Sequence, residues 1–311
     1  MARFLSIVVI LGIFLASCSV SPRSTQTPSI MVSFSVLGDI VQNVVGDAAL
    51  VDTIVGPNND AHAYEPTPQD GAKLDRAAAV VTIGLGFEPW LDELYRASGA
   101  KAPNIISSAR IPAHEANHGD MPQPDANKNA TVQEYDPHIW HDVRNAIVMV
   151  ETIRDGLTKA LPSKATTFRA NSDRYIAELQ LLDADIVSMV AKIPAERRKL
   201  VTNHDTFGYF AQRYGFVVVG TILGVSTESS DPSATKIVAL SQAIRDSGVP
   251  AIFIENMSNS ALITNVAKEA GVEIAPSLYT DALGELGSAG ATYASMMRYN
   301  VTTMSTSLQG N

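Results

Sequence analysis

The residues of this chain that could do chemistry are histidines and carboxylates, and they suit the binding of a divalent metal. The six histidines are His62, His114, His118, His138, His141 and His204. The single cysteine, Cys18, excludes an intramolecular disulfide and a cysteine-based zinc site in the body of the chain. A metal site must therefore use His, Asp or Glu. Zinc accepts imidazole nitrogen and carboxylate oxygen, commonly four ligands in a tetrahedron at about 2.0–2.2 Å.

Several of these residues lie just past an expected strand, or in a loop that leads away from one: His62, His138, His204, Glu255 and Asp281. Ligands of open α/β sheets bind beyond the carboxyl ends of the strands, so these side chains are candidates for one shared site. Their spacing matches no short motif such as HExxH, CxxC or HxH. For any single histidine, a surface or hydrogen-bonded role is the commoner one.

The elements that would position these residues alternate between strand and helix, which is typical of βαβ units around a parallel sheet. Strands are expected over 30–36, 51–55, 78–83, 104–106, 199–202, 216–219, 251–254 and 272–275. Helices are expected over 39–45, 69–77, 89–98, 145–161, 205–214, 232–247, 258–270 and 291–302. The predicted fold class is α/β, with two βα lobes that each contain a mainly parallel sheet. Residues 112–135, rich in Pro, Asn and Asp, read as a long loop.

One long helix is expected between the two lobes. The segment 163–193 has no Pro or Gly, and its apolar residues recur at helical spacing: Phe168, Tyr175, Leu179, Leu182, Ile186, Met189 and Ile193. A continuous helix of this length would approach about 45 Å, longer than a small domain, and would act as a strut. The alternative is two helices broken near Asn171-Ser172-Asp173.

The first residues are predicted to be an export signal rather than part of the fold. An apolar run from Phe4 ends in Leu15-Ala16-Ser17-Cys18, which resembles a bacterial lipobox whose cysteine becomes lipidated. The run, about 12 residues, is shorter than the ~20 of a spanning helix. A plain signal peptide with a chance cysteine is the alternative. Both place the mature protein outside the cytoplasm, in the periplasm or at the cell surface, and Cys18 would anchor it to the membrane.

The predicted domain organisation follows from these elements. It consists of a lipoprotein signal peptide at 1–18, a flexible tether rich in Ser, Thr and Pro at 19–29, an N-terminal lobe at 30–161, a linking helix at 162–193 and a C-terminal lobe at 194–311. The net charge of −9 argues against a nucleic-acid partner.

Four segments resemble, in order, the four metal-ligand motifs of the metal-binding ABC receptors, the zinc and manganese solute-binding lipoproteins of cluster A-I (cluster 9). They are Asp60-Ala61-His62-Ala63-Tyr64-Glu65-Pro66-Thr67, Asp136-Pro137-His138-Ile139-Trp140, Asn203-His204-Asp205-Thr206-Phe207-Gly208-Tyr209-Phe210 and Leu278-Tyr279-Thr280-Asp281-Ala282-Leu283-Gly284. The resemblance implies one metal ligand from each segment: His62, His138, His204 and Asp281. It also implies two lobes bridged by a rigid helix, a monomer, and an ABC permease with its ATPase as partners.

The resemblance favours Zn(II) as the bound metal, with Mn(II) second. Manganese receptors of this family often carry a carboxylate where His204 stands, and a set of three histidines and one carboxylate is softer. Two features depart from the family pattern. The loop that is long and His-rich in many zinc members is short here, with His114 and His118, and it either captures zinc weakly or is an ordinary solvated loop. His141 replaces a usually apolar residue and is either bonded to its neighbours at a helix start or an auxiliary ligand.

Other residues near the motifs are expected to play supporting roles. Asp205 is expected to begin a helix, where free N–H groups favour an acidic side chain. Glu255 is expected to orient a ligand histidine or pair with a nearby base. The aromatic residues Trp90, Trp140, Phe207 and Tyr209 are expected in the core or the cleft wall.

Four functions are compatible in principle with an exported chain that binds a metal. An envelope zinc hydrolase would need an open coordination position, whereas four protein ligands close the site. No nucleophile elbow, phosphate loop or paired catalytic carboxylates are evident, so the chain is predicted not to be an enzyme. A receptor for a metal chelate would have a wide site lined by Arg and aromatic residues rather than three histidines. A surface adhesin is compatible with metal binding, and the sequence leaves it open beside the importer receptor.

Overall fold

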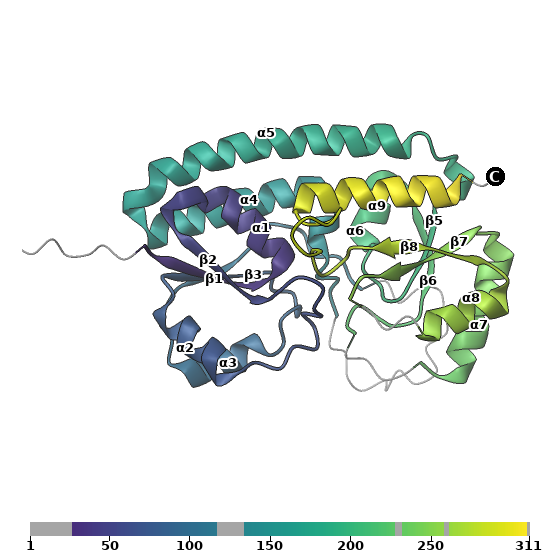
Figure 1. The fold of residues 1–311 in the computed structure, drawn as a ribbon, viewed down its shortest axis with the longest axis horizontal. Coiled ribbons are helices and arrows are strands. Elements are labelled where there is room, and N and C mark those ends of the chain that lie inside the picture. The colour runs from purple at the N-terminus through teal and green to yellow at the C-terminus, as the bar shows by residue number, and fades with distance from the viewer. Residues whose placement is uncertain (1–26, 117–133, 228–231, 258–260, 310–311) are drawn as a thin grey trace, which may run out of the picture.

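The computed structural model describes residues 27–116, 134–227, 232–257 and 261–309. The expected signal segment with Cys18, most of the expected tether, and His118 lie outside these residues. Figure 1 shows two α/β lobes side by side beneath one long helix, α5. None of the helices among the described residues has both the length and the apolar composition needed to cross a membrane.

The N-terminal lobe is built on a parallel four-stranded sheet in the order β2-β1-β3-β4. Its elements are β1 (Ser29–Phe34), α1 (Ser35–Val45), η1 (Gly46–Ala48), β2 (Leu50–Val55), α2 (Pro68–Arg76), β3 (Ala79–Thr82), α3 (Leu91–Ser98), β4 (Asn104–Ile106), η2 (Ile139–His141) and α4 (Val143–Ala160). Ile30 and Val81 pack on the face covered by α1 and α4, whereas Met31 and Val80 pack toward α2 and α3 (Figure 1). Helices on both faces explain why β1 and β3 are apolar at nearly every position.

The C-terminal lobe contains two parallel strand pairs, β5–β6 and β7–β8, with β5 beside β7. Its elements are η4 (Ala195–Arg197), β5 (Lys199–Thr202), α6 (Gly208–Tyr214), β6 (Val217–Thr221), α7 (Ala234–Ser247), β7 (Ala251–Glu255), α8 (Ala261–Ala270), β8 (Glu273–Leu278) and α9 (Tyr293–Leu308). Side chains join the two pairs at the carboxyl ends of β5 and β7. The Glu255 N–H donates to Asn203 Oδ1 at 3.3 Å, and the His204 N–H donates to Glu255 Oε1 at 2.9 Å.

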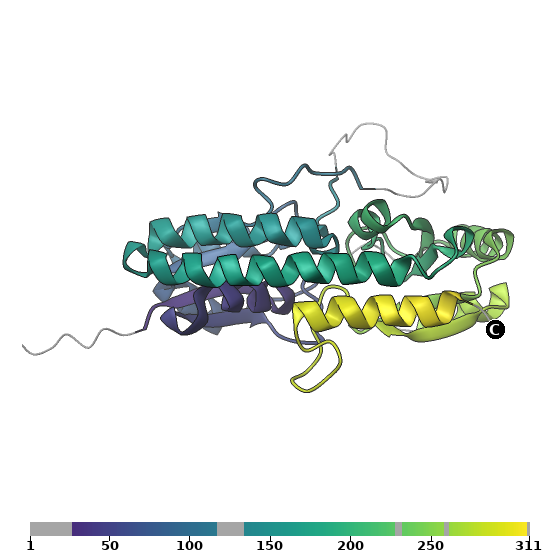
Figure 2. The ribbon, with the colours of Figure 1, turned by 90° about the horizontal axis from the view of Figure 1, so that it is seen from above.

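Helix α5 (Ala165–Val190) follows the short turn η3 (Pro162–Lys164) and runs unbroken through Asn171-Ser172-Asp173. Its 26 residues span about 39 Å at 1.5 Å per residue. It packs against α4 and α1 of the N-terminal lobe and α9 of the C-terminal lobe, and Figure 2 shows these helices running alongside one another. Its buried residues include Phe168, Leu179 and Ile186, so one apolar stripe seals the core of both lobes.

The expected starts of two helices are wrong. Helix α1 begins at Ser35 rather than at residue 39, so Ser35 and Val36 are helical and not part of the expected strand 30–36. Helix α6 begins at Gly208 rather than Asp205, because residues 203–207 form a loop bonded to the segment after β6. Asn203 O accepts from the N–H groups of Ile222 and Leu223, and the Asp205 N–H donates to Gly224 O. Asp205 therefore does not cap a helix.

Candidate metal centre

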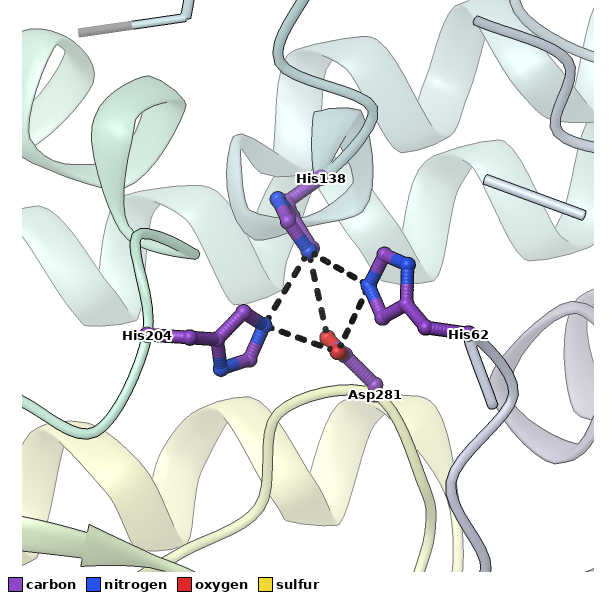
Figure 3. A group of neighbouring side chains, drawn as sticks. All are labelled: His62, His138, His204 and Asp281. Atoms are coloured by element: carbon purple, nitrogen blue, oxygen red, sulfur yellow. Dashed lines mark hydrogen bonds and ion pairs between the residues drawn. The ribbon is translucent and has the colours of Figure 1, made fainter. Parts of the chain in front are cut away.

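Four side chains from distant parts of the chain converge between the lobes. His62 follows β2 and His138 precedes η2 in the N-terminal lobe, whereas His204 follows β5 and Asp281 follows β8 in the C-terminal lobe. Each offers one nitrogen or oxygen atom, and these atoms lie within 4.8 Å of one another. All four side chains are buried, and Figure 3 shows them pointing toward a common centre.

The distances between neighbouring atoms of this set are close to those between ligands of a single metal ion. Nε2 of His138 lies 3.3 Å from Nε2 of both His62 and His204. Asp281 Oδ2 lies 3.2 Å from His62 Nε2 and 2.9 Å from His204 Nε2. Two ligands at about 2.0–2.2 Å from a tetrahedral metal lie roughly 3.3–3.6 Å apart. Despite its two close nitrogens, Asp281 Oδ2 makes no well-oriented hydrogen bond within the described residues. These atoms therefore point at a shared position more than at one another.

Both N-terminal-lobe histidines are held by an aspartate two residues earlier. The His62 N–H donates to Asp60 Oδ1 at 2.9 Å, and the His138 N–H donates to Asp136 Oδ1 at 2.9 Å. Asp136 Oδ1 also lies 2.8 Å from His138 Nδ1, which leaves Nε2 of that ring free for a metal. Asp60 Oδ2 accepts from Thr227 Oγ1 at 2.7 Å, so the His62 loop is tied to the other lobe.

His204 is held by Glu255, at the end of the neighbouring strand β7. Glu255 Oε2 lies 2.6 Å from His204 Nδ1, and Oε1 accepts from the His204 N–H at 2.9 Å. Thr280 Oγ1 donates to Glu255 Oε2 at 2.9 Å, so the same carboxylate also fixes the residue before Asp281. Of the two roles expected for Glu255, the geometry supports the orientation of a ligand histidine.

Two tryptophans fix the backbone beside two of the ligands. Trp90 Nε1 donates to Ala61 O at 2.8 Å, directly before His62. Trp140 Nε1 donates to Thr280 O at 3.1 Å, directly before Asp281. Trp140 is fully buried between the lobes. These rings are thus core and cleft wall, as expected, and each also positions a ligand loop.

The carboxylates around the site control its protonation without metal. Burial opposes charge on His138, but Asp281 and Asp136 outweigh it and raise the His138 pKa to about 9. Burial is likewise outweighed at His204, where Glu255 and Asp281 raise the pKa well above its ordinary value. Burial dominates at His62 and lowers its pKa. Although burial opposes it, the charges of His204 and His138 lower the pKa of Asp281 well below its ordinary range. Without metal, the surrounding carboxylates therefore favour protonated His138 and His204, at the position where a cation would bind.

The remaining candidate residues lie around this centre. Asp205 is buried, and its pKa is raised to about 6 by burial and by nearby Asp136. His114 stacks on Tyr209 with ring centres 4.3 Å apart and is not among the four convergent residues. His141 is fully buried, and burial together with nearby His138 lowers its pKa to about 3. Its Nε2 lies 3.3 Å from Thr206 Oγ1 of the other lobe, so its partner is not a sequence neighbour.

A cavity of about 460 Å³ opens beside His62. Leu85, Gly86, Tyr135 and Val225 are among its lining residues, so both lobes contribute to its wall. Of the four convergent residues, only His62 lines this cavity.

Replacing Glu255 with Gln is expected to lower zinc affinity by about 10–100-fold, because carboxylates that orient a ligand histidine have effects of this size. The amide can supply only one acceptor oxygen where Glu255 now serves His204 and Thr280 with two. Competition titration against a chelator would measure the change. Glu273→Gln, at an exposed position of β8, is the matched control and should leave the affinity unaltered. Equal affinities in both variants would remove Glu255 from any role in binding.

Comparison with known proteins shows similarity over nearly the whole chain. The family model described as "Zinc-uptake complex component A periplasmic" (ZnuA) matches residues 30–307, which include all four convergent residues. The manganese-binding lipoprotein MntA of Halalkalibacterium halodurans is 32% identical over 304 residues, 96% of this chain and 96% of MntA. The zinc-binding protein TroA of Treponema pallidum is 32% identical over 288 residues, 89% of this chain and 87% of TroA. The solved structure of periplasmic zinc-binding TroA matches with a TM-score of 0.81 at 30% identity, covering 91% of this chain and 99% of that one.

Proposed function

Because the chain belongs to the ZnuA family of periplasmic zinc-uptake components, we propose that it carries one Zn²⁺ between its lobes and delivers it to an ABC permease. Membership confirms the family predicted from the four motifs, and the match to TroA confirms the two-lobed α/β fold. The chain is a metal-binding solute-binding protein of an ABC importer. The prediction that it is not an enzyme is also confirmed, since the family and the relatives are described by uptake and binding.

The observation that carries the choice of zinc is the donor set. Three imidazole nitrogens and one carboxylate oxygen, all buried, converge within 4.8 Å of one another. Zinc is commonly bound by four such ligands, whereas manganese favours six oxygen-rich ones. The names of the relatives include both metals, so the choice rests on this chain's own residues. We assign His62, His138, His204 and Asp281 as the four ligands.

The architecture supports a receptor that closes around its cargo. Each lobe supplies two of the four side chains, so a bound ion would join the lobes directly. The packing of α5 against helices of both lobes favours a small closure rather than a wide hinge motion. We further propose a monomer, divided into lobes at 30–161 and 194–311 by the linking helix at 162–193. It would be anchored at the periplasmic or cell surface through a lipid on Cys18, with a permease and its ATPase as partners.

Zinc is expected to raise the melting temperature of the metal-free protein by on the order of 10 °C. Free zinc at 1,000 times the dissociation constant stabilises a folded protein by about 4.1 kcal/mol, and each kcal/mol shifts a chain of this size by roughly 2–4 °C. Calorimetry on protein stripped by a chelator would measure the shift, and elemental analysis should then find one zinc per chain.

The competing metal provides the control for this experiment. Manganese at the same free concentration should produce a smaller shift and should be displaced by zinc. A manganese shift that exceeds the zinc shift would overturn the choice of metal but leave a metal receptor. No shift with either metal would argue against the receptor itself and favour the adhesin alternative.

A further inference from the structure

The two carboxylate oxygens of Asp281 face different groups. Oδ2 lies 2.9 Å from His204 Nε2 and 3.2 Å from His62 Nε2, at a corner of the ligand set. Oδ1 lies 3.7 Å from His138 Nε2, a longer distance than those made by Oδ2. Oδ1 also accepts a hydrogen bond from Thr206 Oγ1 at 3.4 Å. The carboxylate therefore presents one oxygen to the centre and gives the other to Thr206.

Thr206 has a second buried partner, His141, from the opposite lobe. His141 Nε2 lies 3.3 Å from Thr206 Oγ1, and both side chains are fully buried. His141 Nδ1 is also buried and has no hydrogen-bond partner among the described residues. His141 packs between Trp140 and Phe207, so its ring plane is held by aromatic neighbours.

Because Nδ1 of His141 has no partner among the described residues, the direction of the hydrogen bonds between His141, Thr206 and Asp281 can be assigned. A neutral imidazole carries one proton, on either Nδ1 or Nε2. A proton on Nδ1 would leave a buried N–H donor unsatisfied, which is costly, whereas on Nε2 it is donated to Thr206 Oγ1. The Thr206 hydroxyl then accepts from His141, and its own proton is free to go to Asp281 Oδ1. The bonds therefore run one way, from His141 through Thr206 to the carboxylate.

We propose that His141 and Thr206 form a hydrogen-bond relay that occupies Oδ1 of Asp281 and thereby holds this carboxylate to a single metal contact, through Oδ2. The relay rests on the proposed function, because it requires Asp281 to be a ligand. His141 and Thr206 are positioning residues and do not touch the ion.

The relay would set metal selectivity through the coordination number. With one oxygen from Asp281 the site offers four ligands, which suits zinc. Release of Oδ1 would allow both oxygens of Asp281 to bind the metal. The site would then have five ligand atoms, two of them oxygens, and this change favours manganese over zinc. His141 and Thr206 come from different lobes, so the relay is complete only when the lobes are together.

Thr206→Val removes the hydroxyl while preserving the side-chain shape, and His141→Phe removes the donor while preserving the ring. Each is expected to lower the ratio of zinc to manganese affinity by about tenfold or more, as for other groups that orient metal ligands. Thr206→Ser restores the hydroxyl and should return the ratio to that of the unaltered protein. Thr152→Val removes a hydroxyl that bonds Val148 O within α4 and is the matched control.

Cobalt(II) is the spectroscopic probe, since four-coordinate cobalt absorbs visible light far more strongly than five- or six-coordinate cobalt. The unaltered protein and Thr206→Ser should give the intense spectrum, and Thr206→Val and His141→Phe a weak one. An intense spectrum and unchanged selectivity in both altered proteins would overturn the relay while leaving the zinc site intact. A weak spectrum in the unaltered protein would also overturn it, whether or not the variants fold. Absence of metal binding by the unaltered protein would instead defeat the proposed function.

Discussion

Replacing His204 with Ala is expected to lower zinc affinity by about 10²–10³-fold. Zinc held by four protein ligands is bound with about 10–16 kcal/mol, so one ligand accounts for roughly 2.5–4 kcal/mol. His204 is fully buried and its Nε2 faces both His138 and Asp281, so no solvent-exposed group takes its place without rearrangement. Competition with a chelator of known affinity would measure the loss.

The fold should survive this substitution. Glu255 loses the ring of His204 but keeps two donors, the N–H of residue 204 and the Thr280 hydroxyl. Circular dichroism and the melting temperature without metal would verify this. His114→Ala is the matched control, because this histidine stacks on Tyr209 and is not among the four convergent residues. Unchanged zinc affinity in a folded His204→Ala protein would exclude His204 from the site. A loss as large in His114→Ala would make the 112–135 loop part of it.

The four candidate ligands could be predicted because two of their features can be recognised in the sequence alone. Each lies in a loop past an expected strand, and each lies in a short segment that resembles a ligand motif of one family. The linking helix could also be predicted from the sequence, because its 26 residues contain no Pro or Gly and carry one apolar stripe. These features are local, so they need no knowledge of which elements pack together.

The groups that orient the ligands could not be predicted with the same certainty, because their partners are distant in sequence. Glu255 reaches His204 across 51 positions, only because β7 lies beside β5. Thr206 meets His141 across 65 positions and between lobes. Asp136 is the exception, since its spacing from His138 repeats that of Asp60 from His62, and this repetition was a usable signal.

The error at Asp205 has a similar origin. An acidic residue ahead of an apolar helical run usually indicates a helix start. Here the bonds of Asn203 and Asp205 to the segment after β6 hold the chain in a loop until Gly208. The displaced start matters for the site, because Asp136 Oδ2 lies so close to Gly208 that a Cβ there would be 2.5 Å from it. A glycine at this point allows Asp136 to approach and orient His138.

Zinc affinity is expected to fall by up to about 100-fold per pH unit between pH 8 and 6.5, since two ligands must each release a proton. An ordinary histidine would begin to compete with zinc only below about pH 6.5. The His138 pKa of about 9 and the raised His204 pKa move this competition upward, so both rings hold protons at neutral pH without metal. His62 has a lowered pKa and Asp281 stays ionised, so neither steepens the slope in this range. Titrations at fixed free zinc across this range would measure it.

Asp136→Asn tests the cause of this slope. Asn retains an oxygen that can accept from His138 Nδ1 but removes the charge that helps to raise the His138 pKa. The variant should bind zinc more weakly at pH 8, by about 10–100-fold, and its affinity should fall less steeply with acidification. The zinc affinities of the two proteins should therefore converge as the pH decreases. In the unaltered protein, the charge of Asp136 also stabilises the proton on His138, and this proton competes with zinc at lower pH. Parallel curves would show that Asp136 strengthens zinc binding without controlling protonation, and a flat curve for the unaltered protein would contradict a site built from three histidines.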